Sequence, residues 1–330
     1  MASLILPMGE PLIQTFNEYG NLFSIVHHEN NVNYKKLIVQ YFTNLYCVPE
    51  EYSKYKNIFS FYPERHAQLM RECPLLQSQV YFRREVMNQE ESVVSKLTRF
   101  IDQGYYVTSY VDLYYLPCSE SYRKRHLNHK IMIFGYETKK NILLVIDTFR
   151  SFKYAPSEIS YREFEQAFYS FDEADNRRED IIVATRFRDQ EIELDINKLK
   201  KSLQDFYLID ECIPYVSGYH VYDVLEKGIV SDQYLHPQSI KILCEHIEFT
   251  LVRAKLLQEL NIIHLSEKEW EQLNELVKQS TNVRNLYLKC IVLYEIRADQ
   301  EFKNHVMKNI EQMKEKHIEL IQRLVKNMII

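Results

Sequence analysis

Glycine is scarce in this sequence, at only 6 of 330 residues. Loops that bind phosphate through the backbone depend on glycine, because a side chain would block the close approach of the phosphate group. The sequence contains neither a GxGxxG pattern nor a GxxxxGK[ST] pattern. The usual classes of nucleotide-driven enzyme are therefore disfavoured.

Long apolar runs are also missing. No window approaches the roughly 18 to 20 consecutive apolar residues that a membrane-spanning helix needs, and residues 1–16 lack the basic start and long apolar stretch of a secretory signal. The formal net charge is -5 and the basic residues are scattered, which is not typical of a nucleic-acid-binding protein. We expect a cytoplasmic protein with neither a membrane partner nor a nucleic-acid partner.

The cysteines do not form a metal-binding pattern. The sequence has six, with wide spacing, no CxxC motif and no histidine at ligand spacing. We expect free thiols, no disulfide framework, no metal site and no cofactor. The cysteines are Cys47, Cys73, Cys118, Cys212, Cys244 and Cys290.

Hydrophobic periodicity changes along the chain. Residues before about 190 mix helical and strand patterns, whereas later residues follow one helical pattern after another. We therefore predict an α+β fold with an α/β domain at residues 1–190 and an all-α helical domain at residues 191–330 packed on it. The expected helices are residues 32–47, 90–102, 161–171, 238–260, 268–297 and 301–328.

Three segments rich in β-branched and aromatic residues follow one another in the first half. Residues 105–117 read as a strand that ends at a proline, and residues 130–136 and 142–146 flank the polar turn "ETKKN" as an antiparallel hairpin. His129 precedes the first strand of that hairpin, and Asp147 follows the second. This placement suggests a histidine–aspartate pair.

Residues 107–149 carry a series of short elements in a fixed order. An Asp-aromatic-aromatic-Leu-Pro element at residues 112–117 is followed by His129, then by Gly135-Tyr136 in a strand, then by a strand that ends at Asp147. This order resembles the N-terminal domain of the butirosin-biosynthesis H protein family, which is related to C39-type peptidases. The second half resembles the helical half of relatives that accompany non-ribosomal peptide and polyketide synthetases.

The resemblance implies a papain-like cysteine-peptidase-type core and acyl-transfer chemistry. A cysteine thiolate attacks an acyl carbonyl, a histidine activates the cysteine, and an aspartate orients the histidine. It implies that His129 is the base and Asp147 its orienting partner. Binding of the acyl substrate is expected to involve a further set of residues, Asp112, Tyr114, Tyr115 and Tyr136.

The nucleophile is missing from its expected place. In the family it begins the first long helix, where the helix dipole lowers the thiol pKa, but the corresponding "EYGNLFSIVHHENNVNYKKL" has no cysteine. Ser24 lies there in a segment that reads as a strand, and Cys118 opens the loop before His129. Both remain candidate nucleophiles, beside the alternative that the nucleophile has been lost.

Three hypotheses follow. The first is an accessory protein of antibiotic biosynthesis, a pseudoenzyme that binds an intermediate which is tethered to an acyl or peptidyl carrier protein or is a free small molecule. The second is an active acyltransferase, or a thioester or amide hydrolase, that uses His129 and Asp147. The third is a docking protein that uses its helical half. The run "RKRH" at residues 123–126 reads either as a carrier-protein contact or as a solvated loop.

Overall fold

The computed structural model describes residues 3–27, 31–48, 58–62, 70, 72–82, 91–150, 153–170, 181–208, 215–294 and 300–328. The chain divides into two compact units. The first contains residues 1–30 and 66–191, and the second contains residues 31–65 and 192–330. Residues 31–65, which the sequence pattern places in the first domain, therefore group with the C-terminal helices.

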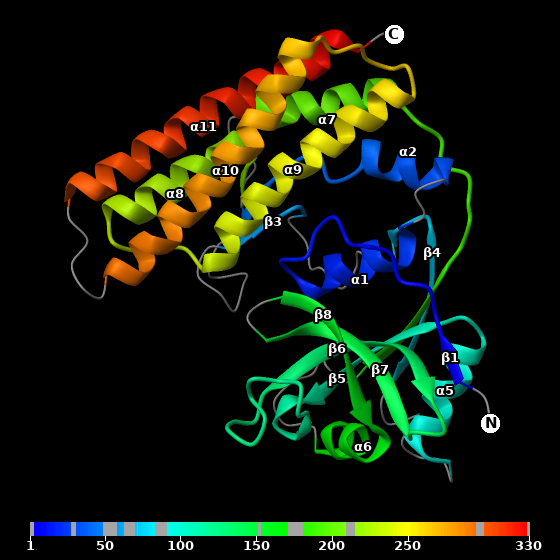
Figure 1. The fold of residues 1–330 in the computed structure, drawn as a ribbon. Coiled ribbons are helices and arrows are strands. Elements are labelled where there is room, and N and C mark those ends of the chain that lie inside the picture. The colour runs from blue at the N-terminus through cyan, green and yellow to red at the C-terminus, as the bar shows by residue number, and fades with distance from the viewer. Residues whose placement is uncertain are drawn as a thin grey trace. The chain divides into compact units, whose positions relative to one another are not determined.

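A seven-stranded antiparallel sheet forms the first unit together with its helices (Figure 1). The strand order is β4-β9-β5-β6-β7-β8, and β1 pairs with the free part of β6. The strands are β1 (Ser3–Ile5), β4 (Leu76–Phe82), β5 (Tyr106–Asp112), β6 (Asn128–Glu137), β7 (Ile142–Arg150), β8 (Lys153–Ser160) and β9 (Ile181–Phe187). The prediction of mixed helix and strand is confirmed for this unit.

The hairpin of β6 and β7 places His129 and Asp147. Met132 lies opposite Ile146, so the pleat gives His129 and Asp147 the same face of the sheet, because alternate residues of a strand share a face. A bulge after Ile133 brings Gly135 against β1, where an added side chain would meet the Leu4 carbonyl oxygen at 2.9 Å. Glycine is therefore needed at this close approach.

The first helix of the unit, α1 (Asn17–Val26), corrects the strand expected around Ser24. Its apolar residues recur at helical spacing and are buried, as an amphipathic helix requires. These residues are Tyr19, Leu22, Phe23, Ile25 and Val26. Phe16 precedes the helix and offers no side-chain capping bond.

The other helices of this unit have side-chain caps. Ser92 accepts a bond from Ser95 N and starts α5 (Val93–Asp102), which confirms the helix expected there. Ser160 and Glu163 form a capping box at α6 (Tyr161–Tyr169). A short 3-10 turn, η2 (Leu113–Tyr115), follows β5.

The second unit is mainly helical but is not all-α. Its three-stranded antiparallel sheet, of order β10-β2-β3, was not expected from the sequence. The strands are β2 (Tyr46–Val48), β3 (Ile58–Ser60) and β10 (Val216–Ser217). The predicted helix 32–47 is shorter than expected and ends before β2.

The long helices of the second unit confirm the periodic patterns. Helix α10 packs against both α9 and α11 (Figure 1). The helices are α2 (Val32–Gln40), α7 (Ile196–Leu208), α8 (Val221–Val230), α9 (Pro237–Glu259), α10 (Glu267–Tyr294) and α11 (Gln300–Asn327), with a 3-10 turn η4 (Gly218–His220). None of the helices in the described part of the chain is both long and apolar enough to cross a membrane.

Candidate catalytic site around His129 and Asp147

His129 and Asp147 lie in contact at the centre of the candidate site. His129 Nε2 is 2.8 Å from Asp147 Oδ2. The Asp147 side chain is 1% exposed and the His129 side chain 36% exposed, so the carboxylate is inside and the imidazole reaches solvent. Because Nε2 faces the carboxylate, Nδ1 is the ring nitrogen left for a ligand or a reacting group.

Two opposing effects act on the pKa of His129. Burial disfavours the charged imidazole, but the charge and hydrogen bonding of Asp147 outweigh it, and the Glu18 carboxylate adds to the increase while Lys130 opposes it. The net result is a pKa above the ordinary value of 6.5. His129 is thus held in an environment that stabilises a proton, as a general base requires at the moment of transfer.

Exchanging Asp147 for asparagine is expected to lower the pKa of His129 below 6.5, because burial then acts without the opposing carboxylate. The raised pKa of the natural protein stabilises the fold below pH 6.5, and this contribution disappears as the pH rises through the folded-state pKa. Imidazole C2–H resonances followed by NMR against pH measure the shift. Asp112→Asn is the matched control and should leave the His129 midpoint unchanged; an equal shift in both variants would refute the pairing.

The first turn of α1 lies beside this end of β6. Asn17 Nδ2 donates to the Lys130 carbonyl oxygen at 2.7 Å, and Glu18 Oε1 is 3.7 Å from Lys130 Nζ. Glu18 also raises the pKa of His129. Asn17, the first residue of α1, therefore lies at the end of β6 that carries His129, one residue before the stretch that was compared with the family.

Ser24 is poorly placed to act as a nucleophile. It lies in α1, two helical turns after Asn17, and is 1% exposed. Its neighbours are polar and equally buried: Tyr154 donates to Asn21 Oδ1 at 2.7 Å, and burial, with a smaller effect from Asp147, raises the pKa of Tyr154. The Tyr154 ring also packs on Gly20, where an added side chain would lie 2.7 Å away. This polar strip joins α1 to β8 and leaves an acyl substrate no access to Ser24.

Cys118 is also unsuited to nucleophilic attack. Burial raises the pKa of its thiol to about 12, with Arg150 opposing and Asp147 and Glu163 adding to the increase. A thiol with that pKa is protonated at neutral pH and is a weak nucleophile. His129 is not among the groups that act on it. Cys47, expected at the end of a helix, lies in β2 instead, and burial raises its pKa to about 12 as well.

The His129 imidazole has no thiol or hydroxyl partner among the residues that the structure describes. The described cysteines besides Cys118 are buried. Within this part of the chain, the arrangement can therefore move a proton but contains no group for a covalent acyl intermediate.

The predicted binding residues fall into two groups. Asp112 organises the loop after β5: it accepts from Tyr114 N at 3.0 Å and Leu127 N at 3.1 Å, and its Oδ2 is 2.5 Å from His126 Nδ1. The His126 ring stacks on Tyr114 with centroids 4.2 Å apart, and Tyr115 lies beside both. His126 was not predicted as a site residue, because in the sequence it appears only as the last residue of the run "RKRH".

Tyr136 belongs to the core. It is 4% exposed, and its hydroxyl donates to Asp102 Oδ1 at 2.6 Å. This hydrogen bond is the main cause that raises the pKa of Tyr136 to about 12. The contact fastens β6 to α5, so nothing in the geometry presents Tyr136 to a ligand.

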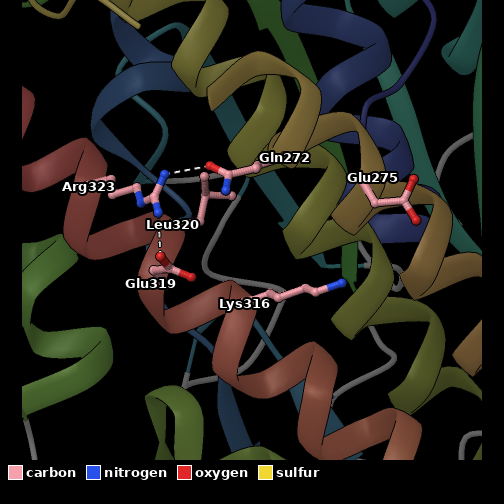
Figure 2. A pocket seen from close by; sticks show the side chains of 6 residues that line it. All are labelled: Gln272, Glu275, Lys316, Glu319, Leu320 and Arg323. Carbon is pink, nitrogen blue, oxygen red and sulfur yellow. Dashed lines mark hydrogen bonds and ion pairs between the residues drawn. The ribbon is translucent and has the colours of Figure 1, made fainter. Parts of the chain in front are cut away.

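A groove of about 150 Å³ lies in the second unit between α10 and α11. Figure 2 shows Arg323 reaching both Gln272, at 2.5 Å, and Glu319. Lys316 lines the same groove and bonds to Gln279 at 3.0 Å. Both cationic side chains of the groove therefore already have partners on α10 or α11. The residues that line it include no histidine or cysteine.

Among the described residues, no group of three or more His, Cys, Asp or Glu side chains could hold a metal ion. No known family model matches the chain, and no curated protein matches its sequence.

Proposed function

We propose that this protein is an accessory protein of peptide or polyketide biosynthesis that has a papain-like core and binds an acyl intermediate without forming a covalent bond to it. The observation that carries the proposal is Asn17 at the start of α1, beside the His129 end of β6. An amide takes the place where the family resemblance calls for a thiol. The substrate class is an acyl group on a carrier-protein thioester, or the same group after release.

The order of elements supports a papain-like core. A helix that begins at the candidate site precedes an antiparallel sheet, and the histidine and aspartate occupy neighbouring strands of that sheet. Papain-like enzymes place their nucleophile, base and orienting residue in the same order. We extend this likeness to substrate binding, but not to the formation of a covalent acyl-enzyme.

The site has groups suited to an acyl carbonyl. The first N–H groups of α1 have no side-chain cap from Phe16, and the positive end of a helix dipole favours an oxygen with partial negative charge. His129 Nδ1 can accept from an amide or amine N–H of the ligand. Together they could orient a thioester without attacking it.

The second candidate is an active enzyme that uses general-base catalysis, and the His129–Asp147 contact favours it. His129 Nδ1 would take the proton from a water or an acceptor amine while that oxygen or nitrogen bonds to the acyl carbon. The tetrahedral intermediate would then collapse, the carbon–sulfur bond would break, and the carrier thiolate would receive the proton back from Nδ1. This sequence balances without a protein nucleophile.

The docking hypothesis is less supported. The exposed apolar residues described in the second unit lie on four different helices and one strand: Val32, Leu208, Val216, Val230 and Val292. A docking surface is more often a continuous apolar patch. This hypothesis stays a prediction.

Intact-protein mass spectrometry with the small thioester S-hexanoyl-N-acetylcysteamine separates these functions. We expect no hexanoyl adduct on the natural protein and no thiol release above background, together with saturable binding seen as NMR shifts of His129 that are absent in His129→Ala. Thiol release that depends on His129, without an adduct, would replace the binding function by the hydrolase. A stable adduct that needs His129 would overturn both, because it would reveal a nucleophile.

A further inference from the structure

Two histidines meet in the interior of the second unit, far along the chain from the candidate site. His246 of α9 and His317 of α11 are both 0% exposed. Their ring centroids are 5.2 Å apart. Phe206 of α7 stacks on His246 at 5.3 Å and contacts His317 at 4.8 Å. The pair therefore joins three helices through its rings.

Each imidazole has a hydrogen-bond partner at one ring nitrogen and none at the other. His246 Nε2 is 3.2 Å from the Thr43 carbonyl oxygen, so this nitrogen carries the hydrogen and Nδ1 holds the lone pair. His317 Nδ1 is 2.9 Å from the Tyr222 hydroxyl. His246 Nδ1 and His317 Nε2 are buried and have no partner. A proton added to either of these nitrogens would therefore have no hydrogen-bond acceptor.

The charges around the pair also oppose protonation. Arg253, fully buried on α9, faces His246 as a cation, and His317 itself acts on His246 in the same direction. Among the described residues that act on His246, the Thr43 carbonyl alone favours the proton, and none is a carboxylate. Burial, the largest cause, lowers the pKa of His246 well below 6.5 and that of His317 to about 3.

The other titratable groups at the pair are neutral. Tyr222 of α8 bonds to His317, and burial raises its pKa. Cys244 of α9 acts on Tyr222, and burial raises its pKa to about 12. No group on α7, α8, α9 or α11 that acts on the pair can therefore compensate a positive imidazole.

The segment that follows α2 depends on the same contacts. His246 binds the Thr43 carbonyl, and Arg253 donates to the carbonyls of Val39, Tyr41 and Phe42. Phe61, beside β3, packs on the His246 ring at 5.7 Å. A change at His246 thus reaches Thr43 directly, and Arg253 of the same helix holds the carbonyls just before it.

We propose that the His246–His317 pair is an acid-sensitive lock of the second unit: below about pH 6 it favours opening of α9, α11 and residues 39–43, while the sheet of the first unit stays folded. The unfolded state gains a proton on each imidazole near pH 6.5, and the folded state does not. The free energy of unfolding of the second unit is therefore highest above pH 6.5, and it decreases as the pH falls below that value.

The expected effect is large. Between pH 7 and pH 5 the unfolding equilibrium constant of the unit rises about 25-fold for one such imidazole and about 600-fold for two. His236, which caps α9, adds in the same direction, because burial lowers its pKa too. The pH dependence that comes from His236 remains when both histidines of the pair are substituted.

Urea unfolding of the full chain at pH 7, 6 and 5 tests the lock, with fluorescence of the single tryptophan as the signal. That residue, Trp270, lies in α10 and reports on the second unit. His246→Gln keeps a donor toward Thr43 and His317→Asn keeps a polar group toward Tyr222, but neither titrates. His305→Gln, an exposed position on α11, is the matched control.

Each single variant should lose about half of the pH dependence on a logarithmic scale, the double variant should lose most of it, and the control should keep it. Hydrogen exchange at pH 5 should accelerate in α9, α11 and residues 39–43 but not in β5 to β7. An unchanged slope in the double variant would overturn the lock. Should the variants fail to fold, NMR titration of the natural protein decides: folded-state midpoints near 6.5 for both imidazoles would overturn it, and midpoints below 5 would support it.

Discussion

Replacing Asn17 by cysteine is expected to create a thiol that a small thioester acylates, whereas the natural protein forms no adduct. The new thiol would begin α1, where the positive end of the helix dipole lowers a thiol pKa. It would also lie beside the Lys130 carbonyl that Asn17 now contacts at 2.7 Å, next to His129. Intact mass after incubation with S-hexanoyl-N-acetylcysteamine measures the adduct.

The dependence on His129 distinguishes a restored site from a merely accessible thiol. Adding His129→Ala to Asn17→Cys should slow acylation by about 10² to 10⁴, the usual contribution of a positioned acid–base group. The natural protein supplies the background of its own cysteines. Equal rates with and without His129 would show that Asn17 does not occupy the nucleophile position, and the proposed likeness to a papain-type cleft would then lose its main support.

Replacing Arg253 by methionine is expected to lower the free energy of unfolding by about 3 to 5 kcal/mol. Its guanidinium donates to three carbonyls at the end of α2, at distances of 3.1, 2.7 and 2.8 Å. Methionine fills a similar volume but leaves these carbonyls without a donor, and each unsatisfied buried acceptor costs about 1 to 3 kcal/mol. Urea unfolding at pH 7, followed by Trp270 fluorescence, measures the loss.

Arg323→Met is the matched control for Arg253. Arg323 lies on α11 with about a third of its side chain exposed, and it pairs with Glu319 and Gln272 (Figure 2). Ion pairs in such positions contribute about 1 kcal/mol or less. A loss at Arg253 no greater than at Arg323 would show that residues 39–42 do not depend on the buried guanidinium.

The long helices were predictable because their apolar spacing persists over many residues. Helices α9, α10 and α11 agree with the predicted ranges within about three residues at each end, which is the ordinary variation in helix boundaries. The hairpin of β6 and β7 was predictable from two β-rich runs around a short polar turn. In each case neighbours along the chain are also neighbours in space.

Short elements were less predictable. The run Leu22–Val26 is five residues long, and a short apolar run fits a buried strand as well as a helix; the structure makes it part of α1. The strands of the second unit have two or three residues each, too few for a periodic signal. Asn17 was missed because nothing local distinguishes an asparagine at a candidate site from one that simply starts a helix.

By itself the sequence determined the mixture of helix and strand, the long helices, the hairpin and the order of His129 and Asp147 within it, since these follow from local spacing. Only the tertiary structure decided that the two side chains meet at 2.8 Å, that Asn17 contacts the Lys130 carbonyl next to His129, that Ser24 is buried, and that burial raises the pKa of the Cys118 thiol. It also decided the burial of His246. Burial and pairing arise between residues that are distant along the chain, and their free energies depend on neighbours that no local pattern names.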